Sequence, residues 1–331
     1  MAEPKQIVAL PYGRPLGDFA LQLVCAASIQ ESVENSVLTV VWRPDRPFKK
    51  HLISMLPNAA EMAVDGLIPA DIFDPGHGSA VEVKPPHQMI MLADLVLPPW
   101  MLRGRILAAL PKIATLNAPE LELDMPGDWH VVVHWRESGA PGRPDTFRDT
   151  DAELWVQIIE FIRSLGGKVV RMGHEGMTPV DCDLDLAGQP FEHQVEAIRR
   201  ARFCVMAASG PASLASAMGT PILFCGYPGG CGVFHGHDMV IPLRFWDPAG
   251  TYVPRQAVLD KGLLDDVALP DWRASGGRVE AGSFEEICAG IEAMMGRERQ
   301  TDPGTTVKAL EIPFLDAGPT AMRPEFFWLD E

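Results

Sequence analysis

The sequence has few of the features that mark secreted, membrane-spanning or metal-binding proteins. Its six cysteines carry no metal-ligand spacing, and Cys25, Cys204 and Cys225 lie inside apolar segments, as buried free thiols do. No run of about 18 apolar residues is present, so no membrane span is predicted. The opening residues MAEPKQIVAL lack a basic segment followed by a long apolar one, so no signal peptide is expected. We therefore expect a cytoplasmic protein.

Positive charge is also scarce. The chain has 28 Lys and Arg residues against 44 Asp and Glu residues, a formal net charge of −16. General nucleic-acid binding needs a basic face, so the composition argues against a nucleic-acid partner. A protein this acidic can still bind a phosphorylated small molecule where a few arginines and a helix N-terminus meet it locally.

The length and the order of apolar segments predict two α/β domains. A chain of 331 residues with 47% hydrophobic and 22% charged residues suits two globular domains of about 150 residues each. A strand–helix–strand pattern opens the chain at Gln6–Trp42, and a second set of strands and helices begins at Trp129. The Pro-punctuated, acidic stretch Asn117–Gly127 between them is the expected linker. The expected parts are an N-terminal domain at 1–121, a C-terminal domain at 128–300 and a tail at 301–331 that packs back on the body.

The stretch Phe191–Pro228 contains a candidate phosphate site. The apolar run Phe203–Ala207 predicts a buried strand, the residues Ser209-Gly210-Pro211 suit the start of a new helix, and Ile222–Cys225 predicts the next strand. Two parallel strands joined by a helix make half of a nucleotide-binding Rossmann-like unit. Free backbone N–H groups at the helix start, with Gly210 allowing close approach, favour a bound phosphate. The pattern alone fits a plain strand–helix connection equally well.

The same stretch, read as SGPASLASAMGTPILFCGYP, resembles the phosphate-binding segment of the heptosyltransferase-like glycosyltransferases of the GT-B fold. That family pattern is Asp-Ser/Thr-Gly-Pro, one residue, His-Leu-Ala, and then Ala-x-Gly-x-Pro. The matching positions are Ser209, Gly210, Pro211, Leu214, Ala215, Ala217, Gly219 and Pro221. Ala208 replaces the usual Asp and Ser213 the usual His, two positions that help to hold the sugar nucleotide in the family. The phrase at 166–173 also resembles a less studied group of bacterial glycosyltransferases of this fold.

The resemblance implies an α/β fold with two Rossmann-like domains facing a cleft. It also implies a glycosyltransferase that moves a sugar from a nucleotide-sugar donor to a hydroxyl of a glycan or other acceptor, without a metal or other cofactor. The donor would bind the second domain and the acceptor the first. Two alternatives stay open: a nucleotide-sugar epimerase or hydrolase of the same fold, and a non-catalytic sugar-nucleotide-binding or assembly protein. The departures at Ala208 and Ser213 are what keep the second alternative open.

The resemblance assigns a catalytic base to Asp18. In heptosyltransferase-like enzymes a Gly-Asp after the first strand supplies the carboxylate that takes the proton of the acceptor hydroxyl, and Gly17-Asp18 stand at that place. An acidic residue in a first helical turn is also favoured by the helix dipole alone. Arg14, in the preceding loop, is a further candidate contact to donor or acceptor.

The donor diphosphate is expected between Arg136 and the helix start at Ser209, Gly210, Pro211 and Ser213. Arg136 follows a predicted strand, and side chains at the carboxyl ends of parallel strands face the ligand crevice. Its guanidinium can bind a phosphate through two hydrogen bonds. The phrase His134-Trp135-Arg136 is similar to one in bacterial fucosyltransferases that use GDP-fucose, although His134 is better explained by packing. Further candidate contacts to donor or acceptor are Arg143, Arg171, Gly173 and His174.

Two other groups of polar residues resemble metal sites superficially. Asp181, Asp183 and Asp185 alternate as manganese ligands do in a different transferase fold, but their Pro- and Gly-flanked surroundings predict a solvated turn. His235 and His237 lie near Cys231 and lack a fourth ligand. No metal site is predicted.

Overall fold

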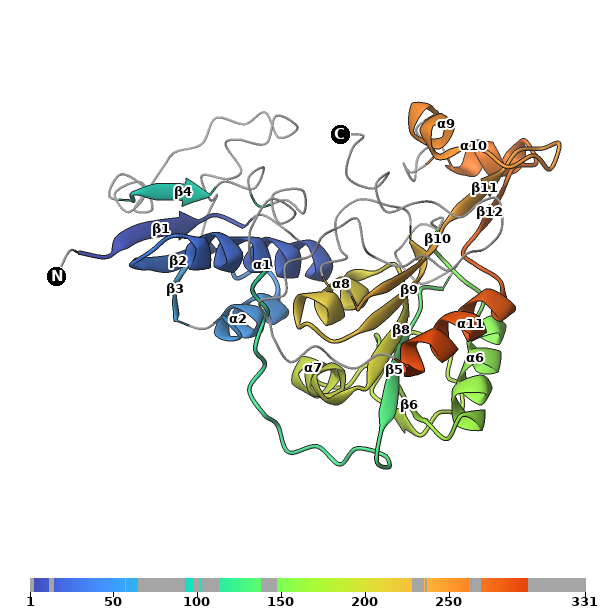
Figure 1. Ribbon diagram of the computed structural model, residues 1–331, viewed down its shortest axis with the longest axis horizontal. Helices are drawn as coiled ribbons and strands as arrows, with labels where there is room; N and C mark the ends of the chain where they lie inside the picture. The colour runs from blue at the N-terminus through green and yellow to red at the C-terminus, as the bar shows by residue number, and fades with distance from the viewer. Residues whose placement is uncertain are drawn as a thin grey trace.

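The computed structural model describes residues 3–11, 15–56, 58–64, 93–97, 102, 113–137, 148–227, 235, 237–261, 263 and 269–296. Within these ranges the chain forms two parallel β-sheets flanked by helices, and a small two-stranded sheet lies at one end (Figure 1). The expected α/β architecture with two Rossmann-like halves is confirmed. The predicted tail at 301–331 lies outside the described residues.

The first sheet has four parallel strands in the order β3-β2-β1-β4. Its elements are β1 (Lys5–Ala9), α1 (Leu16–Ser32), β2 (Ser36–Trp42), α2 (Pro47–Ser54), β3 (Ala59–Ala63) and β4 (Leu95–Leu97). Helix α1 is apolar around most of its circumference, which is typical of a helix buried on several sides. It packs on its own sheet and also against α8 of the second half.

The second sheet has six parallel strands in the order β10-β9-β8-β5-β6-β7. Its strands are β5 (His130–His134), β6 (Lys168–Arg171), β7 (Leu184–Asp185), β8 (Phe203–Ala207), β9 (Ile222–Tyr227) and β10 (Met239–Pro242). Its helices are α6 (Ala152–Ser164), α7 (Phe191–Arg200), α8 (Gly210–Ala217) and α11 (Phe284–Met295). The chain moves outward from β5 through β6 to β7 and then returns to β8 on the other side of β5. The sheet therefore changes direction between β5 and β8, the place where open α/β sheets bind ligands.

The two faces of the second sheet belong to different apolar clusters. Val131 and Val133 of β5 face α6 and α11, whereas Val132 belongs to the cluster that holds α7 and α8. Side chains alternate along a strand, so one short apolar run supplies both faces. The cluster on the α8 side continues into α1 and the first sheet. The two halves therefore share one apolar core.

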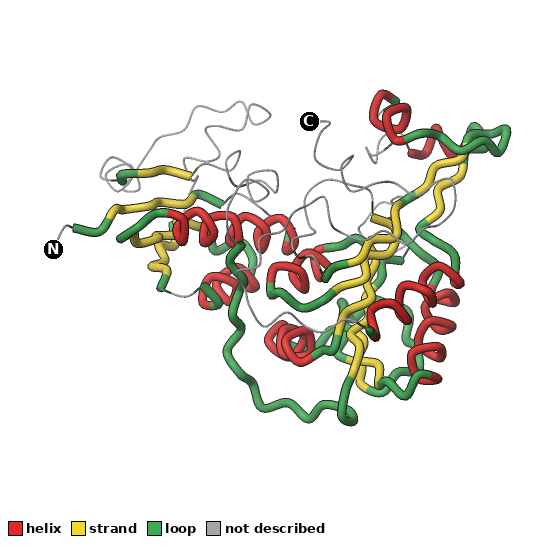
Figure 2. The backbone as a smooth tube through the Cα atoms, viewed as in Figure 1, coloured by secondary structure: helices red, strands yellow, loops and turns green. Residues whose placement is uncertain are grey.

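The segment joining the two sheets is extended and contacts both halves. Figure 2 shows it as a long loop between the first sheet and β5. The amide of Leu116 donates to the carbonyl of Ala217 in α8 at 2.9 Å, and the amide of Asn117 donates to the carbonyl of Met55 at 2.8 Å. The linker predicted at Asn117–Gly127 falls within this segment. Its first residue, Asn117, is held by the carbonyl of Met55 at the end of α2.

A small lobe follows β10. It consists of β11 (Arg244–Trp246), α9 (Arg255–Asp260), α10 (Leu269–Ala274) and β12 (Arg278–Glu280). The two strands are antiparallel. The lobe has a separate apolar cluster, which includes Leu243 and Phe245. Arg244 donates to Glu286 of α11, which fixes the lobe to the second half.

Candidate functional site

A pocket lies at the carboxyl edge of the second sheet. It has a volume of about 290 Å³ and is lined by Leu16, His134, Trp135, Arg136, Met172, Gly173, His174, Phe191, Gln194, Ser209, Gly210 and Pro211. These residues follow β5, β6 and β8, three neighbouring strands, or begin α1, α7 and α8. The pocket therefore occupies the place where the strand order reverses.

The N-terminus of α8 forms one wall of this pocket. Ser209 is the N-cap residue, and its hydroxyl oxygen accepts a hydrogen bond from the amide of Ala212 at 3.4 Å. Pro211 stands in the first turn, where the lack of an N–H costs nothing. The remaining N–H groups of the first turn and the positive end of the helix dipole favour an anion. Ser209, Gly210 and Pro211 thus lie where the sequence predicts them.

Arg136 lines the same pocket and has a second, structural contact. Its Nε donates to Oδ1 of Asp149 at 3.4 Å. The Asp149 side chain is fully buried and that of Arg136 is 14% exposed. A guanidinium has five N–H donors, and the Nε–H is the one that makes this contact with Asp149. The structure places Arg136 and the start of α8 around one cavity, as the sequence predicts.

Two histidines of the pocket have opposite tautomers when neutral. His134 has Nδ1 3.1 Å from the carbonyl oxygen of Met172, which can only accept, so Nδ1 carries the proton. His174 has Nδ1 3.1 Å from the amide of Gly176, which can only donate, so its proton is on Nε2. The packing explanation of His134 is therefore incomplete, because this buried ring also lines the pocket.

Gln194 and Phe191 line the pocket and were not predicted to do so. The Gln194 Oε1 accepts from the amide of Gly173 at 3.1 Å, and its Nε2 donates to the carbonyl of Gln189 at 3.0 Å. Phe191 packs against Phe48 of the first half, with ring centroids 6.2 Å apart. In the sequence, both residues fall on the face of the predicted helix that is expected to pack against the core. No signal in the sequence separates them from the core.

Three predicted contacts lie elsewhere or outside the described residues. Arg171 is buried and is not part of the pocket lining. It donates to Asp185 at 3.0 Å and to the carbonyl of Thr178, and its guanidinium stacks on the ring of Trp135. Arg171 therefore holds the loop after β6 instead of facing the pocket. Arg14 and Arg143 lie outside the described residues.

Ser213 also faces away from the pocket lining. Its hydroxyl donates to the carbonyl of Ser209, one turn earlier, at 3.4 Å. Its side chain lies against Gly17 in the first turn of α1. The expected diphosphate contact from Ser213 is replaced by a contact between two helices.

Asp18 lies in the first turn of α1, two residues after Leu16, and is not part of the pocket lining. The residue reaches solvent, yet protein surrounds much of its carboxylate. This partial burial raises the pKa of Asp18 above its ordinary value, and the positive charge of Arg148 opposes the rise. A carboxylate with a raised pKa is a stronger proton acceptor than an ordinary one.

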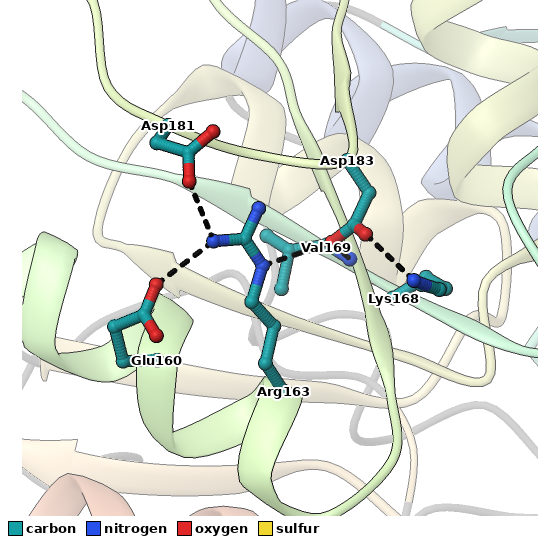
Figure 3. Close-up of polar contacts among 6 residues, drawn as sticks. All are labelled: Glu160, Arg163, Lys168, Val169, Asp181 and Asp183. Carbon is teal, nitrogen blue, oxygen red and sulfur yellow. Dashed lines mark hydrogen bonds and ion pairs between the residues drawn. The ribbon is translucent and has the colours of Figure 1, made fainter.

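The alternating aspartates form ion pairs with basic residues (Figure 3). Arg163 of α6 contacts Asp181 at 3.0 Å and Asp183 at 3.2 Å. Asp183 also accepts from the Lys168 ammonium group at 3.0 Å and from the amide of Val169 at 3.0 Å. These contacts lower the pKa of Asp183 although its partial burial acts to raise it. The segment is thus an acidic turn, as predicted, and its ion pairs and hydrogen bonds also attach it to α6 and β6.

Two properties of the described residues bear on metals and membranes. No three His, Cys, Asp or Glu side chains in the described ranges are grouped so as to hold a metal ion. Among the helices that the structure describes, none has the length and apolarity needed to cross a bilayer.

Comparison with known proteins identifies the fold. No family model and no curated protein sequence matches the chain. Among solved structures, the glycosyl transferase family 9 protein from Veillonella parvula DSM 2008 superposes with a TM-score of 0.52 at 13% identity, covering 89% of this chain and 98% of that one. ADP-heptose LPS heptosyltransferase II from E. coli matches with a TM-score of 0.44 at 15% identity, over 81% of this chain and 99% of that one. The TM-score of this second match is too low for the match to support any conclusion about the chain. The chain therefore shares its overall fold with this glycosyl transferase family 9 protein.

Proposed function

We propose that the protein is a glycosyltransferase that transfers a sugar from a nucleotide-sugar donor to a hydroxyl of a glycan or other acceptor. One observation carries this proposal: Arg136 and the N-terminus of α8 line a single cavity at the carboxyl edge of a parallel sheet. A guanidinium and the free N–H groups of a helix start are complementary to a diphosphate. Neither group requires a metal ion to bind an anion.

The proposed chemistry is displacement at the anomeric carbon of the sugar. The acceptor oxygen forms the new bond as the bond to the nucleoside diphosphate breaks. Negative charge develops on the leaving diphosphate, where Arg136 and the α8 N–H groups stabilise it. Asp18 takes the proton of the attacking hydroxyl. The partial burial that raises the pKa of Asp18 suits this role, because a carboxylate with a raised pKa accepts a proton more readily.

The family has an Asp where this chain has Ala208, and the proposed phosphate site does not depend on that Asp. The Ala208 side chain is apolar and 6% exposed, within the shared core. Anion binding then depends on Arg136 and on backbone N–H groups, which the substitution leaves in place. We also propose a cytoplasmic location, which is supported by the buried cysteines Cys25, Cys204 and Cys225, because they are not joined in disulfides.

Calorimetry with ADP, GDP and UDP, each compared with its nucleoside, tests the donor site. The expected result is that at least one diphosphate binds about tenfold or more tightly than its nucleoside, a difference of about 1.4 kcal/mol. Equal binding of the diphosphates and their nucleosides would refute the assignment. Product analysis with the radiolabelled sugar donor of the preferred nucleotide then separates transfer from hydrolysis or epimerisation.

A further inference from the structure

The first turns of α1 and α8 lie in direct contact, although they belong to different halves of the chain. A Cβ placed on Gly17 would lie 3.0 Å from the Cα of Gly210 and 3.0 Å from the Oγ of Ser213. A Cβ placed on Gly210 would lie 3.1 Å from the backbone nitrogen of Gly17 and 3.1 Å from the Cβ of Leu16. The two backbones therefore touch with no side chain between them, which small residues alone allow.

The contact lies beside the pocket. Leu16 and Gly210, which flank it, both line the cavity. Asp18 follows Gly17 directly on α1. The same contact therefore relates three groups in space: the proposed base, the first turn that binds the diphosphate, and the pocket wall formed by Leu16.

Ser213 is the side chain of α8 that makes this approach possible. Its hydroxyl is turned toward the carbonyl of Ser209, within its own helix. A Cβ placed on Gly17 would also lie 3.1 Å from the Cβ of Ser213, so each of the two positions limits the size of the side chain at the other.

We propose that Gly17 and Ser213 are paired positioning residues, whose small size lets α1 dock on α8 and so fixes Asp18 relative to the diphosphate-binding turn. This inference rests on the proposed function of the pocket. The steric contact itself does not depend on that function. Neither residue is assigned a contact with substrate.

The test uses four variants of the full chain: Gly17→Ala, Ser213→Gly, the double variant, and Gly296→Ala as control. Alanine is a better helix former than glycine, so helix propensity predicts that Gly17→Ala raises Tm. The close contact predicts the opposite, a fall of about 3–8 °C. The double variant removes both Ser213 atoms near the new methyl group and keeps only the Gly210 Cα at 3.0 Å. Gly17→Ala is therefore expected to lower Tm less in the Ser213→Gly background than in the wild type, and this smaller fall is the recovery. The control adds a methyl group with nothing nearer than 3.7 Å and is expected to leave Tm within about 1 °C.

A second readout separates positioning from stability alone. In protein carrying ¹³C-labelled Asp carboxyl groups, Asp18→Asn assigns the Asp18 resonance, and its titration gives the pKa. In the wild type we expect a pKa above the ordinary value of about 3.9. Gly17→Ala is expected to lower it, because α1 moves away from the protein that surrounds the carboxylate. The double variant is expected to restore it.

The outcomes decide the proposal without any substrate. A fall in Tm and in the Asp18 pKa for Gly17→Ala, with recovery of both in the double variant, supports it. A higher or unchanged Tm for Gly17→Ala overturns it, as does an unmoved pKa. Absence of recovery in the double variant also overturns it, even if Gly17→Ala does not fold. Binding of ADP, GDP and UDP to the wild type separately reports on the proposed function.

Discussion

Arg136 belongs to two interactions, and a simple alanine substitution removes both. It lines the pocket, and its Nε donates to the carboxylate of Asp149, whose side chain is fully buried. Removing one partner of a buried ion pair typically costs about 3–5 kcal/mol. Because the N···O distance of this pair is long, 3.4 Å, Arg136→Ala is expected at the lower end, about 3 kcal/mol, or a fall in Tm of about 4–8 °C.

The binding loss has a different origin. A hydrogen bond to a charged group contributes about 1.5–3 kcal/mol, so Arg136→Ala should weaken nucleoside diphosphate binding by about 10- to 150-fold. Weaker diphosphate binding by Arg136→Ala alone has two explanations. The guanidinium is lost as a contact to the ligand, or Asp149 shifts without its partner and distorts the pocket. A second substitution at Asp149 separates them.

The variants are Arg136→Ala, Asp149→Asn and the double variant. Asp149→Asn removes the buried negative charge that needs a cation, so the double variant should recover most of the lost Tm. It should not recover diphosphate binding, since the guanidinium is still missing. Thermal unfolding gives the first quantity and calorimetry at 25 °C the second, with the bare nucleoside as the control ligand. Recovery of diphosphate binding in the double variant would refute a direct role for Arg136 and reduce it to a support for Asp149.

Three further predictions concern other parts of the molecule. Asp18→Asn should lower turnover of the identified donor about 10²- to 10⁴-fold with diphosphate binding nearly unchanged, and unchanged turnover would remove it as the base. Gln194→Leu should destabilise the protein by about 1–3 kcal/mol, because the partly buried amide of Gly173 loses its acceptor; Gln194→Glu keeps that acceptor and should lower the free energy of unfolding in urea by less. The lowered pKa of Asp183 contributes stability above the ordinary carboxyl pKa that is lost as pH falls through the folded-state value. Tm measured from about pH 7 to pH 3 should therefore fall less steeply for Asp183→Asn, and identical slopes would show that the Arg163 network contributes nothing.

Local patterns predicted the second half of the molecule well. The strand at Phe203–Ala207, the helix start at Ser209-Gly210-Pro211 and the strand at Ile222 all lie where apolar runs and Pro and Gly positions indicate. Arg136 could be placed at the pocket because it follows a buried strand, and the ends of parallel strands share one edge. These predictions need only short-range information and the geometry of a parallel sheet.

The partners of individual side chains could not be predicted in the same way. Arg171 follows the same rule as Arg136, at the end of the neighbouring strand, yet it is buried against Asp185 and the ring of Trp135. A strand-end position indicates an edge of the sheet but does not indicate whether the side chain turns to the pocket or to an adjacent loop. Gln194 was missed for the converse reason, because a buried glutamine on an amphipathic helix has no pattern that separates it from the core.

Ser213 shows how a contact between the two halves changes the meaning of a motif. Within its own segment, the substitution of the family histidine by serine reads as a lost ligand and favours a protein without activity. In the structure its neighbour is Gly17, from the opposite half of the chain, with the Ser213 Oγ 3.0 Å from the position that a Cβ on Gly17 would take. The two positions are far apart in the sequence, so no inspection of the segment around Ser209 could connect them. The substitution therefore does not by itself indicate loss of the proposed function, because the Ser213 side chain packs against Gly17 and is not part of the pocket lining.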